Sequence, residues 1–558
     1  MKTLVLIIGS VLYTSFAVSQ TPKIIQNQLG FYKESQKIFS INESSKTEFS
    51  IVNYTDSIEV FKGITSISIS DQFSGLSWSN ADFSSLVTEG KYLLKINNEY
   101  SYPFIISENV YSDILKISIR SYFLNRASID IESDFGSQYS REMGHPDSTV
   151  FIHESAASEN RPAESTISSQ GGWYDAGDYN KYIVNSSITV YTLLRTYEEH
   201  TGLFDTLSLN IPESNDNKAD LINEIEYNIN WMLTMQDPKD GGVYHKLTTK
   251  NFSPFIKPSL ANEKRYVVQK STSAALDFAA SMAYYSRLIQ DSIYSAEILS
   301  KAQQAFSWAE KNPSKLYIQP NDITTGTYED TNLEDEFFWA ATELYLASNQ
   351  NQQYLDYIKN VYISEIPSWQ SVKTLGIISL ANSETKFSKK CRKEIYYWAN
   401  KLHKFASHQP LKQSLGVNGD GDYNWGSNSN IANHNLLLIQ AYKLSGKKKY
   451  LATIQNNLNY LLGNNANGIC FVTGFGSKSP LNPHHRPSAT DVIKEPYPGF
   501  LVGGPNKDKQ DADFVKYKST KPALCYEDQE ESYASNEIAI NWTAPFIYSI
   551  SFIVDRHN

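Results

Sequence analysis

The sequence predicts a mainly α-helical protein, in which a small β-sandwich precedes a ring of helical hairpins. Short runs that alternate apolar and polar residues recur between about Thr21 and Ser107, and several short strands at this spacing are typical of a sandwich. After about Asn109, apolar residues recur every three or four positions, which indicates helices. Long segments rich in Gly, Pro and Asn separate some of these helices, and such loops can form a functional cleft at one end of a ring.

Residues 1–19 have the features of a secretory signal peptide. Lys2 supplies a positive charge, residues 4–16 supply an apolar run, and Ala17-Val18-Ser19 fits a cleavage site between small residues. The apolar run is too short to span a bilayer, and no other run is long enough. We therefore expect an exported protein, extracellular or periplasmic, without a membrane span.

Residues 21–107 form the predicted sandwich. Its clearest hairpin joins residues 92–96 to residues 100–102, because the Asn97-Asn98 pair between them is typical of a tight turn. No cluster of charged residues or histidines stands out in this segment, so we expect a structural role for the domain.

Residues 109–558 form the predicted helical domain. The periodicity is clearest over residues 111–124, 182–197, 221–235, 273–289, 295–309, 334–347, 352–361, 371–381, 390–405, 431–444, 450–462 and 536–550. A stacked helical-repeat solenoid would also give many helices, but its sequence would show a fixed repeat period, which this chain lacks. A ring of helical hairpins is therefore the better interpretation.

The composition argues against some partners and leaves others open. The 558 residues carry a formal charge of −10 without a long basic run, whereas nucleic-acid binding needs clustered Lys and Arg. Aromatic residues make up 13% of the chain, and they either fill the core or stack on the apolar faces of sugars. The odd count of cysteines (Cys391, Cys470 and Cys525) leaves at least one thiol free, and pairing of the last two stays open.

The loop of residues 171–182 places Asp175 and Asp178 just ahead of a predicted helix. Two carboxylates this close can hold one water molecule, with one taking its proton and the other orienting it. Asp is also a favoured helix N-cap. Taken alone, the pair fits a cap as well as it fits catalysis.

Two later segments carry further candidates. Glu537 leads into an apolar helix, where an acid either stabilises the helix N-terminus or donates a proton because apolar surroundings raise its pKa. His484 and Arg486 lie on a Pro-flanked loop. Their side chains could donate hydrogen bonds to hydroxyl groups or pack the loop itself.

Cleavage of a glycosidic bond would give these carboxyl groups one purpose. The leaving oxygen needs a proton from an acid, and the attacking water needs a base on the opposite face of the sugar. Enzymes that invert the anomeric configuration place the two carboxyl groups about 6.5–9.5 Å apart to fit that water.

Together, the motifs resemble the family-nine glycoside hydrolases, which are inverting cellulases with an (α/α)6-barrel catalytic domain. Residues 171–182 look like the family's Asp-Ala-Gly-Asp loop, residues 471–486 like its His-x-Arg segment, and residues 526–542 like the segment around its catalytic acid. Residues 27–31 are similar to the start of the immunoglobulin-like domain that precedes the barrel in one branch. Residues 212–215, 235–237, 241–246 and 425–428 also look like family segments, in the family's order.

The resemblance implies a role for each candidate residue. Asp178 would be the general base, Asp175 would help to hold the water, and Glu537 would be the general acid. The residues implied to bind substrate are Trp425, His484, Arg486 and Tyr533. The expected partner is a β-glucan of the cellulose, mixed-linkage or xyloglucan type, bound by a monomer that requires no organic cofactor.

Metal binding is less clearly indicated. Relatives with the N-terminal domain often carry a Cys-His pair that helps to bind zinc, but Gly144 precedes His145 here, which makes zinc doubtful. Some members hold calcium beside a Gly-x-Tyr…Asp-Glu segment, which residues 326–328 and the pair Asp335-Glu336 resemble. Carboxylate oxygens suit calcium, although an acidic helix start is the alternative interpretation.

Two other functions stay open beside endo-acting hydrolysis. An exo-acting relative, such as a cellobiohydrolase, β-glucosidase or glucosaminidase, would differ by loops that block one end of the cleft, and residues 130–169 and 497–524 are candidates for such loops. A non-catalytic glycan-binding protein of the cell surface would keep the aromatic residues. It would not need Asp175, Asp178 and Glu537 together.

Overall fold

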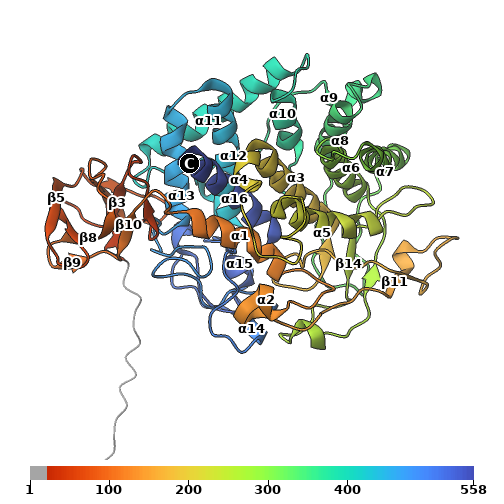
Figure 1. The fold of residues 1–558 in the computed structure, drawn as a ribbon, viewed down its shortest axis with the longest axis horizontal. Helices are drawn as coiled ribbons and strands as arrows, with labels where there is room; N and C mark the ends of the chain where they lie inside the picture. Colours follow the sequence, from red (N-terminus) through yellow and green to blue (C-terminus); the bar gives the residue numbers. More distant parts are fainter. Residues whose placement is uncertain (1–21, 558) are drawn as a thin grey trace, which may run out of the picture.

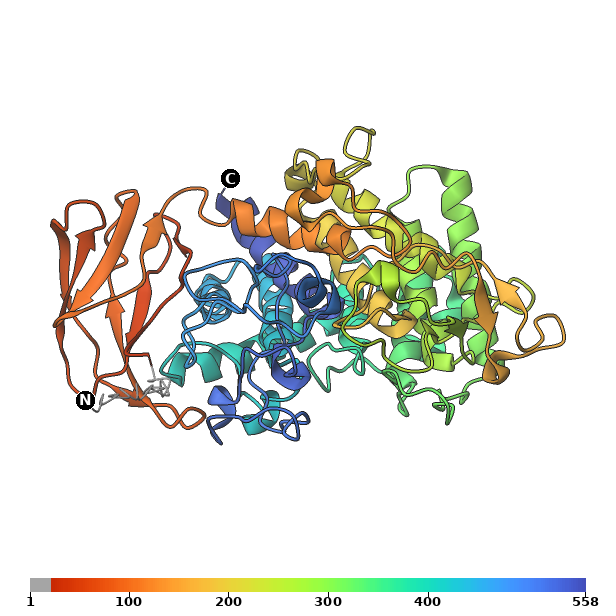
Figure 2. The same ribbon diagram turned by 90° about the horizontal axis from the view of Figure 1, so that it is seen from below.

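The computed structural model describes residues 22–557 and shows a small sandwich at one end of a larger helical domain (Figure 1). The turned view shows the same two parts side by side along the long axis (Figure 2). This architecture confirms the predicted fold class. The predicted signal peptide, residues 1–19, lies outside the described residues.

The sandwich consists of two sheets that enclose an aromatic core. One sheet has the order β1 (Ile24–Ile25), β3 (Ile38–Ile41), β7 (Ser77–Asp82), β6 (Ile69–Ser70); the other has the order β2 (Gly30–Phe31), β10 (Phe104–Ile106), β8 (Gly90–Ile96), β4 (Glu48–Asn53), β5 (Glu59–Ile64), with β9 (Glu99–Tyr100) paired to β8. The rings of Phe31, Phe39, Phe83 and Phe104 contact one another in this core. The predicted hairpin forms between β8 and β9, and Asn97 in its turn has a φ of 52°, which Asn adopts more readily than most residues.

The helical domain alternates along the chain between an outer and an inner ring. The inner ring contains α3 (Ile183–Glu199), α6 (Thr272–Ser286), α8 (Glu334–Ala347), α10 (Lys373–Ala381), α12 (Ser427–Ser445) and α16 (Ile540–His557), and the outer ring contains α1 (Ser112–Leu124), α5 (Asp220–Thr234), α7 (Ser292–Lys311), α9 (Leu355–Ile358), α11 (Ser388–His408) and α13 (Lys449–Leu461). Every residue of α6 and α10 is buried, whereas α7 and α11 bury only one face. Burial on all sides is expected of an inner helix, so the alternation confirms an (α/α)6 barrel.

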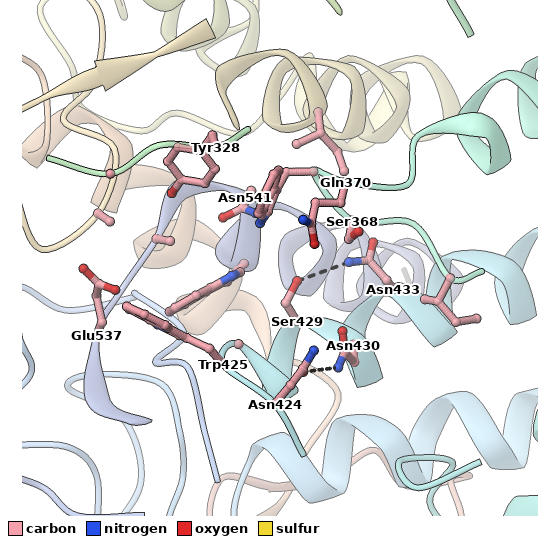
Figure 3. Close-up of a pocket in the computed structure, with 18 of the residues that line it drawn as sticks. Tyr328, Ser368, Gln370, Asn424, Trp425, Ser429, Asn430, Asn433, Glu537 and Asn541 are labelled. Carbon is pink, nitrogen blue, oxygen red and sulfur yellow. Dashed lines mark hydrogen bonds between the residues drawn. The ribbon is translucent and has the colours of Figure 1, made fainter. Parts of the chain in front are cut away.

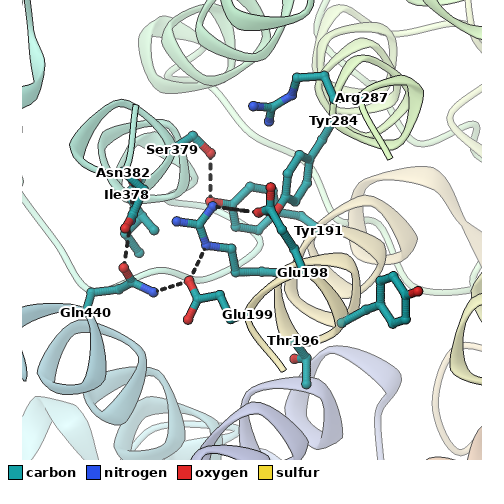
Figure 4. A network of polar contacts seen from close by, with 12 residues as sticks. Tyr191, Thr196, Glu198, Glu199, Tyr284, Arg287, Ile378, Ser379, Asn382 and Gln440 are labelled. Carbon is teal, nitrogen blue, oxygen red and sulfur yellow. Dashed lines mark hydrogen bonds and ion pairs between the residues drawn. The ribbon is translucent and has the colours of Figure 1, made fainter. Parts of the chain in front are cut away.

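A buried polar network joins the inner helices at the end of the barrel where they terminate (Figure 4). Arg195 of α3 pairs with Glu199 at 2.7 Å, and Gln440 of α12 donates to Glu199 at 2.6 Å and to the Tyr548 hydroxyl of α16 at 2.7 Å. Gln440 also accepts a hydrogen bond from Asn382, which follows α10, at 2.7 Å. The buried charges at this end of the barrel are therefore paired or hydrogen-bonded.

Some elements differ from the expectation. The predicted helix over residues 352–361 is only a 3-10 turn, η4 (Gln352–Tyr354), followed by α9, and the predicted helix over residues 536–550 begins at Ile540. An unpredicted sheet has the order β12 (Thr166–Ile167), β11 (Val150–Ile152), β15 (Tyr266–Val267), β14 (Lys246–Thr248), β13 (Lys181–Tyr182). Strands of two or three residues carry no readable alternation. The remaining turns are α2 (Ser133–Gly136), α4 (Thr201–Phe204), α14 (Arg486–Thr490), α15 (Tyr533–Asn536), η1 (Ser137–Tyr139), η2 (Glu154–Ala156), η3 (Pro258–Leu260), η5 (Gly419–Asp422) and η6 (Pro522–Leu524).

Hydrogen bonds and ring stacking fix the sandwich to the barrel. Asn27 donates to the Tyr111 hydroxyl at 2.7 Å, and Gln28 donates from its side chain to the Gly468 carbonyl at 3.0 Å. The ring of Tyr32 stacks on that of His557 at 3.9 Å. The Asn27 and Gln28 contacts show that residues 27–31 help to dock the sandwich on the barrel domain.

Neither a disulfide nor a membrane-spanning helix is present within residues 22–557. All three cysteines of this range are buried free thiols, so Cys470 and Cys525 do not pair. In the same range, no helix combines the length with the apolar character that crossing a bilayer requires.

Candidate active site

A cleft of about 970 Å³ opens at the end of the barrel where the inner helices begin. Every segment that leads into an inner helix contributes to its wall, as shown by the lining residues Asp178, Phe252, Tyr328, Trp369, Trp425 and Glu537. Figure 3 shows Tyr328, Trp425 and Glu537 around this cleft. Helix N-termini carry partial positive charge, so this end of the barrel is suited to hold carboxylates.

Asp175 is buried, and both of its carboxylate oxygens are occupied. Oδ1 accepts a hydrogen bond from Asn185 Nδ2 at 2.6 Å, and Oδ2 accepts one from the Tyr328 hydroxyl at 2.7 Å. Two donors, one on α3 and one in the loop ahead of α8, therefore fix the orientation of this carboxylate.

Asp178 differs from Asp175 in having one oxygen left free. Its Oδ2 accepts from Asn180 Nδ2 at 2.5 Å and from the Tyr182 hydroxyl at 3.1 Å, while its Oδ1 is buried without a partner in the described structure. Neither Asp caps the following helix, because α3 begins after Tyr182 and has no side-chain cap. The capping interpretation of the pair is therefore wrong.

Burial raises the pKa of both Asp carboxyl groups. Burial and the charge of Asp178 raise the pKa of Asp175 to about 8. Burial also raises the pKa of Asp178, but the Arg486 guanidinium and the hydrogen bonds from Asn180 and Tyr182 oppose that rise. The ionised form is therefore better stabilised at Asp178 than at Asp175.

Glu537 lies in extended backbone between α15 and α16, with a φ of −70° and a ψ of 154°. It is therefore not in the first turn of a helix, and the interpretation as a dipole-stabilising acid is wrong. Its Oε1 accepts the Gly177 amide at 3.3 Å. Burial and the charge of Asp178 raise the pKa of Glu537 well above its usual value, which favours the protonated form of this carboxyl group.

Gly177 joins the Asp loop to the segment around Glu537. Its carbonyl accepts from the Arg486 amide at 3.1 Å and from Arg486 Nη1 at 2.7 Å. A Cβ at this position would press against the His484 carbonyl oxygen and would lie 3.1 Å from Glu537 Oε1. Only glycine lets the two segments approach this closely.

His484 and Arg486 lie behind the cleft wall more than in it. His484 Nδ1 bonds to the Glu530 carbonyl at 2.6 Å, and burial lowers the pKa of His484 to about 4. Since a carbonyl only accepts, Nδ1 carries the proton and Nε2 is an acceptor. Arg486 is buried, and its Nε donates to the Ser253 carbonyl at 2.7 Å.

Trp425 and Tyr533 form an aromatic pair at the cleft. Trp425 lines the cleft with 40% of its surface exposed. The ring of Tyr533 lies 5.2 Å from that of Trp425, and its hydroxyl donates to the Gln510 carbonyl at 2.7 Å. Tyr533 therefore supports Trp425, which presents the accessible ring.

The Arg486→Met variant is expected to move both limbs of the pH profile of kcat/KM to higher pH. The guanidinium opposes the rise in the pKa of both Asp178 and Glu537. Without it, Asp178 ionises only at higher pH, and Glu537 keeps its proton to higher pH. Arg486→Lys, which keeps the charge, is the control. If kcat/KM falls at every pH while both limbs of its pH profile stay at the same pH, the expectation is contradicted.

Two residues of the cleft were not singled out as site residues from the sequence. Tyr328 holds Asp175, and its ring meets that of Trp369 edge-on at 5.0 Å. Trp369 lines the cleft on the segment that precedes α10. The Gly-x-Tyr pattern was a signal for Tyr328, but it pointed to calcium; no motif marked Trp369.

The two candidate calcium ligands have different surroundings. Asp335 accepts the Val372 amide at 2.9 Å, whereas both carboxylate oxygens of Glu336, like both of Asp277 on α6, are buried without a partner in the described structure. Burial and the charge of Asp335 raise the pKa of Asp277 and of Glu336 well above their usual values. Within residues 22–557, no three His, Cys, Asp or Glu side chains meet as a metal site requires.

The position at which relatives carry a zinc-binding Cys offers no room for one. A Cβ on Gly144 would lie 2.7 Å from the Tyr174 hydroxyl oxygen. The adjacent His145 bonds through Nδ1 to the same hydroxyl at 2.9 Å. The residues present therefore do not fit a zinc ion.

Comparison with known proteins agrees with this geometry. Residues 111–550 match glycosyl hydrolase family 9, and residues 19–101 match the cellulase N-terminal ig-like domain. The chain is 41% identical over 554 residues to a xyloglucan-specific endo-beta-1,4-glucanase of Bacteroides ovatus, covering 96% of this chain and 94% of the relative. It is 30% identical over 562 residues to a cellodextrinase of Butyrivibrio fibrisolvens, covering 96% and 100%. A solved Bacteroides ovatus GH9 structure has a TM-score of 0.90 at 40% identity, covering 96% of this chain and 99% of the other.

The chain therefore belongs to glycosyl hydrolase family 9, with a cellulase-type immunoglobulin-like domain ahead of the catalytic barrel. Within that family it is a glycoside hydrolase of the endoglucanase type, acting on β-1,4-glucan. This confirms the expected enzyme class and removes the non-catalytic glycan-binding protein from the alternatives.

Proposed function

We propose that this endoglucanase cleaves β-1,4-glucan with inversion, with Asp178 as general base and Glu537 as general acid. The observation that carries the proposal is the unequal bonding of the two Asp residues. Asp175 has both oxygens occupied, while Asp178 Oδ1 is unpartnered. Asp178 can accept a proton from water, and Asp175 can only orient that water.

The proposed reaction is a single displacement. The water attacks the anomeric carbon while Asp178 takes one of its protons, and the bond from the anomeric carbon to the leaving oxygen breaks. Glu537 transfers its proton to that oxygen, which departs as the hydroxyl of the released chain. The raised pKa of Glu537 suits this role, since the acid must be protonated before each turnover. The new hydroxyl group is in the α configuration.

We propose that Trp425 stacks on a sugar ring, with Tyr533 behind it. Trp369, which also lines the cleft and contacts Tyr328 edge-on, would provide a second ring. Apolar sugar faces bind such rings well. His484 would accept a sugar hydroxyl at Nε2, and Arg486 would act on substrate mainly through the charge that it places beside Asp178 and Glu537.

Xyloglucan is the substrate that we propose within the β-1,4-glucans. The relative with 41% identity is named for this polymer. The cleft wall also offers many amide and hydroxyl groups, namely Ser368, Gln370, Asn424, Ser429, Asn430, Asn433 and Asn541. A branched glucan presents more hydroxyl groups than a linear one, and side-chain amides can both donate to and accept from them.

The test is a comparison of kcat/KM on xyloglucan, mixed-linkage glucan and a soluble cellulose derivative, together with the products from cellohexaose. We expect the highest value on xyloglucan and an early fall in viscosity, because internal bonds are cut first. A higher value on a linear glucan would refute the substrate preference alone. Release of only glucose or cellobiose from the first minutes would instead support an exo-acting enzyme.

We also propose that calcium binds beside Asp335 and Glu336, where the unpartnered oxygens of Glu336 and of the neighbouring Asp277 are suitable ligands. Further oxygens would come from backbone carbonyls or water. Chelation with EDTA should then lower Tm by about 5 °C, and added calcium should restore it. In the Glu336→Gln variant neither treatment should change Tm. An unchanged Tm of the native chain in EDTA would show that a shared proton, not calcium, neutralises this pair.

Export and a monomeric state are further proposals. Residues 1–19 carry the pattern of a signal peptide. N-terminal sequencing of the secreted protein should start near Gln20, and the mass in solution should match one chain. Retention of Met1 in the recovered protein would contradict export by this route.

A further inference from the structure

A tight turn of the sandwich, residues 71–76 between β6 and β7, reaches the barrel domain. Asp71 is buried and organises the turn. Its carboxylate accepts the Phe73 amide at 3.0 Å and the Ser74 hydroxyl at 2.5 Å, and its carbonyl accepts the Gly75 amide at 2.8 Å. Because these bonds lie within the turn, the turn is rigid, and it presents Phe73 in a fixed position.

Phe73 is buried against Gly416 and Tyr423, which belong to the segment of residues 416–426 in the barrel domain. Its ring lies 5.2 Å from that of Tyr423. A Cβ on Gly416 would lie 2.5 Å from the Phe73 ring, and Gly416 has a φ of 96°. Phe73 also accepts the Ala523 amide at its carbonyl, at 3.1 Å. Glycine is therefore required at position 416 for two reasons: its backbone has a positive φ, and the Phe73 ring occupies the place of a side chain.

The other side of the same segment lines the active-site cleft through Asn418, Gly421, Asp422, Asn424, Trp425 and Gly426. Asp422 connects the two sides. Its Oδ2 accepts the amides of Gly416 at 2.9 Å and Asn418 at 3.2 Å, while its carbonyl accepts Asn430 Nδ2 at 3.0 Å. Figure 3 shows Asn430 bonded to Asn424, next to Trp425.

We propose that Phe73 is a positioning residue for substrate binding: by filling the space behind residues 416–426, it fixes Trp425 in the orientation that stacks on a sugar ring. The inference rests on the proposed stacking at Trp425. It gives the sandwich a part in the active site, where the sequence indicated only a structural role. The physical path is short, since Tyr423, which touches Phe73, is two residues from Trp425.

Loss of the Phe73 ring should weaken binding more than it slows the reaction. A cavity would open behind a segment that contains Gly416, Gly419, Gly421 and Gly426, and glycine-rich backbone can shift into such a space. Trp425 would then lose its fixed orientation. Asp178 is held by Asn180 and Tyr182, and Glu537 by the Gly177 amide, so both carboxyl groups would keep their geometry.

The experiment is a double-mutant cycle on the full chain with Phe73→Ala, Trp425→Ala and the double variant. KM and kcat are measured on cello-oligosaccharides of several lengths, well below each Tm. We expect Phe73→Ala to raise KM about fivefold, with kcat within about twofold of the native value. It should affect the same oligosaccharide lengths as Trp425→Ala. The double variant should be no worse than Trp425→Ala alone, because both changes remove one interaction.

Phe83→Ala is the matched control. Phe83 is equally buried, but it lies in the core of the sandwich, so its loss should lower Tm without changing KM. Phe73→Leu, which refills part of the space, should restore KM partly. If Phe73→Ala leaves KM unchanged while Trp425→Ala raises it, or if the two effects add, the positioning role is refuted. If Trp425→Ala itself leaves KM unchanged, the proposed stacking fails and the inference fails with it.

Discussion

The Glu537→Gln variant is expected to lower kcat on cello-oligosaccharides by about 10²–10⁴-fold, the contribution typical of general acid catalysis. The amide cannot donate the proton that the leaving oxygen needs. Glutamine has nearly the shape of a protonated glutamic acid, and its Oε1 can still accept the Gly177 amide. Removing this buried acid should therefore leave Tm within a few degrees of the native value.

A substrate with an acidic leaving group separates the loss of the acid from a general loss of structure. The dinitrophenolate group of a dinitrophenyl β-cellobioside leaves without being protonated. Glu537→Gln should therefore hydrolyse this substrate at a rate close to that of the native enzyme. Slow cleavage of this substrate by a folded Glu537→Gln variant would mean that Glu537 is not the general acid.

The Asp178→Asn variant is expected to lower kcat by a similar factor of about 10²–10⁴. Here the activated leaving group should give no rescue, because water activation is needed whatever the leaving group. Asp175→Asn is the informative comparison. Its two oxygens serve Asn185 and Tyr328, so it should lose less activity than Asp178→Asn. Equal losses would contradict the separate roles that the bonding indicates.

The stereochemistry of the product provides an independent check on Asp178. A base that activates water in one displacement gives the α-anomer as the first product, which NMR can detect before mutarotation. A β-anomer would mean that a carboxylate attacks the sugar directly, and it would exclude the assignment of Asp178 as a base.

Periodicity allowed the fold to be predicted in outline because the inner and outer helices are long. The ends of the elements were predicted less well. The segment around Glu537 has apolar residues at helical spacing, yet residues 537–539 are extended, since Glu537 pairs with His484 and Ile538 with Val502. Such pairings join residues far apart in the chain, and local patterns do not contain them. The strands β11 to β15 were missed for the same reason.

Site residues that lie within one sequence motif could be predicted. Site residues that only the packing of the barrel brings together could not. Asp175, Asp178 and Glu537 stood out because each lies in a dense polar and aromatic segment. Trp369 is an isolated tryptophan in sequence, and only the barrel brings it to Tyr328. Phe73 was not singled out from the sequence, because nothing local shows that its neighbours are Gly416 and Tyr423.

The close approach at Gly177 means that one part of the cleft sets the stereochemistry of the reaction and another part sets which polymer is bound. The carboxyl groups of Asp178 and Glu537 are attached to backbone segments that touch each other at Gly177 and are also joined by a hydrogen bond from the Ile540 amide to the Asp175 carbonyl. Their spacing is therefore inherited from main-chain contacts, while Trp369 and Trp425 lie on other segments of the wall. A designer could exchange those aromatic segments to accept differently branched polymers and still obtain the same anomer, whereas any side chain larger than hydrogen at position 177 would alter the reaction for every substrate.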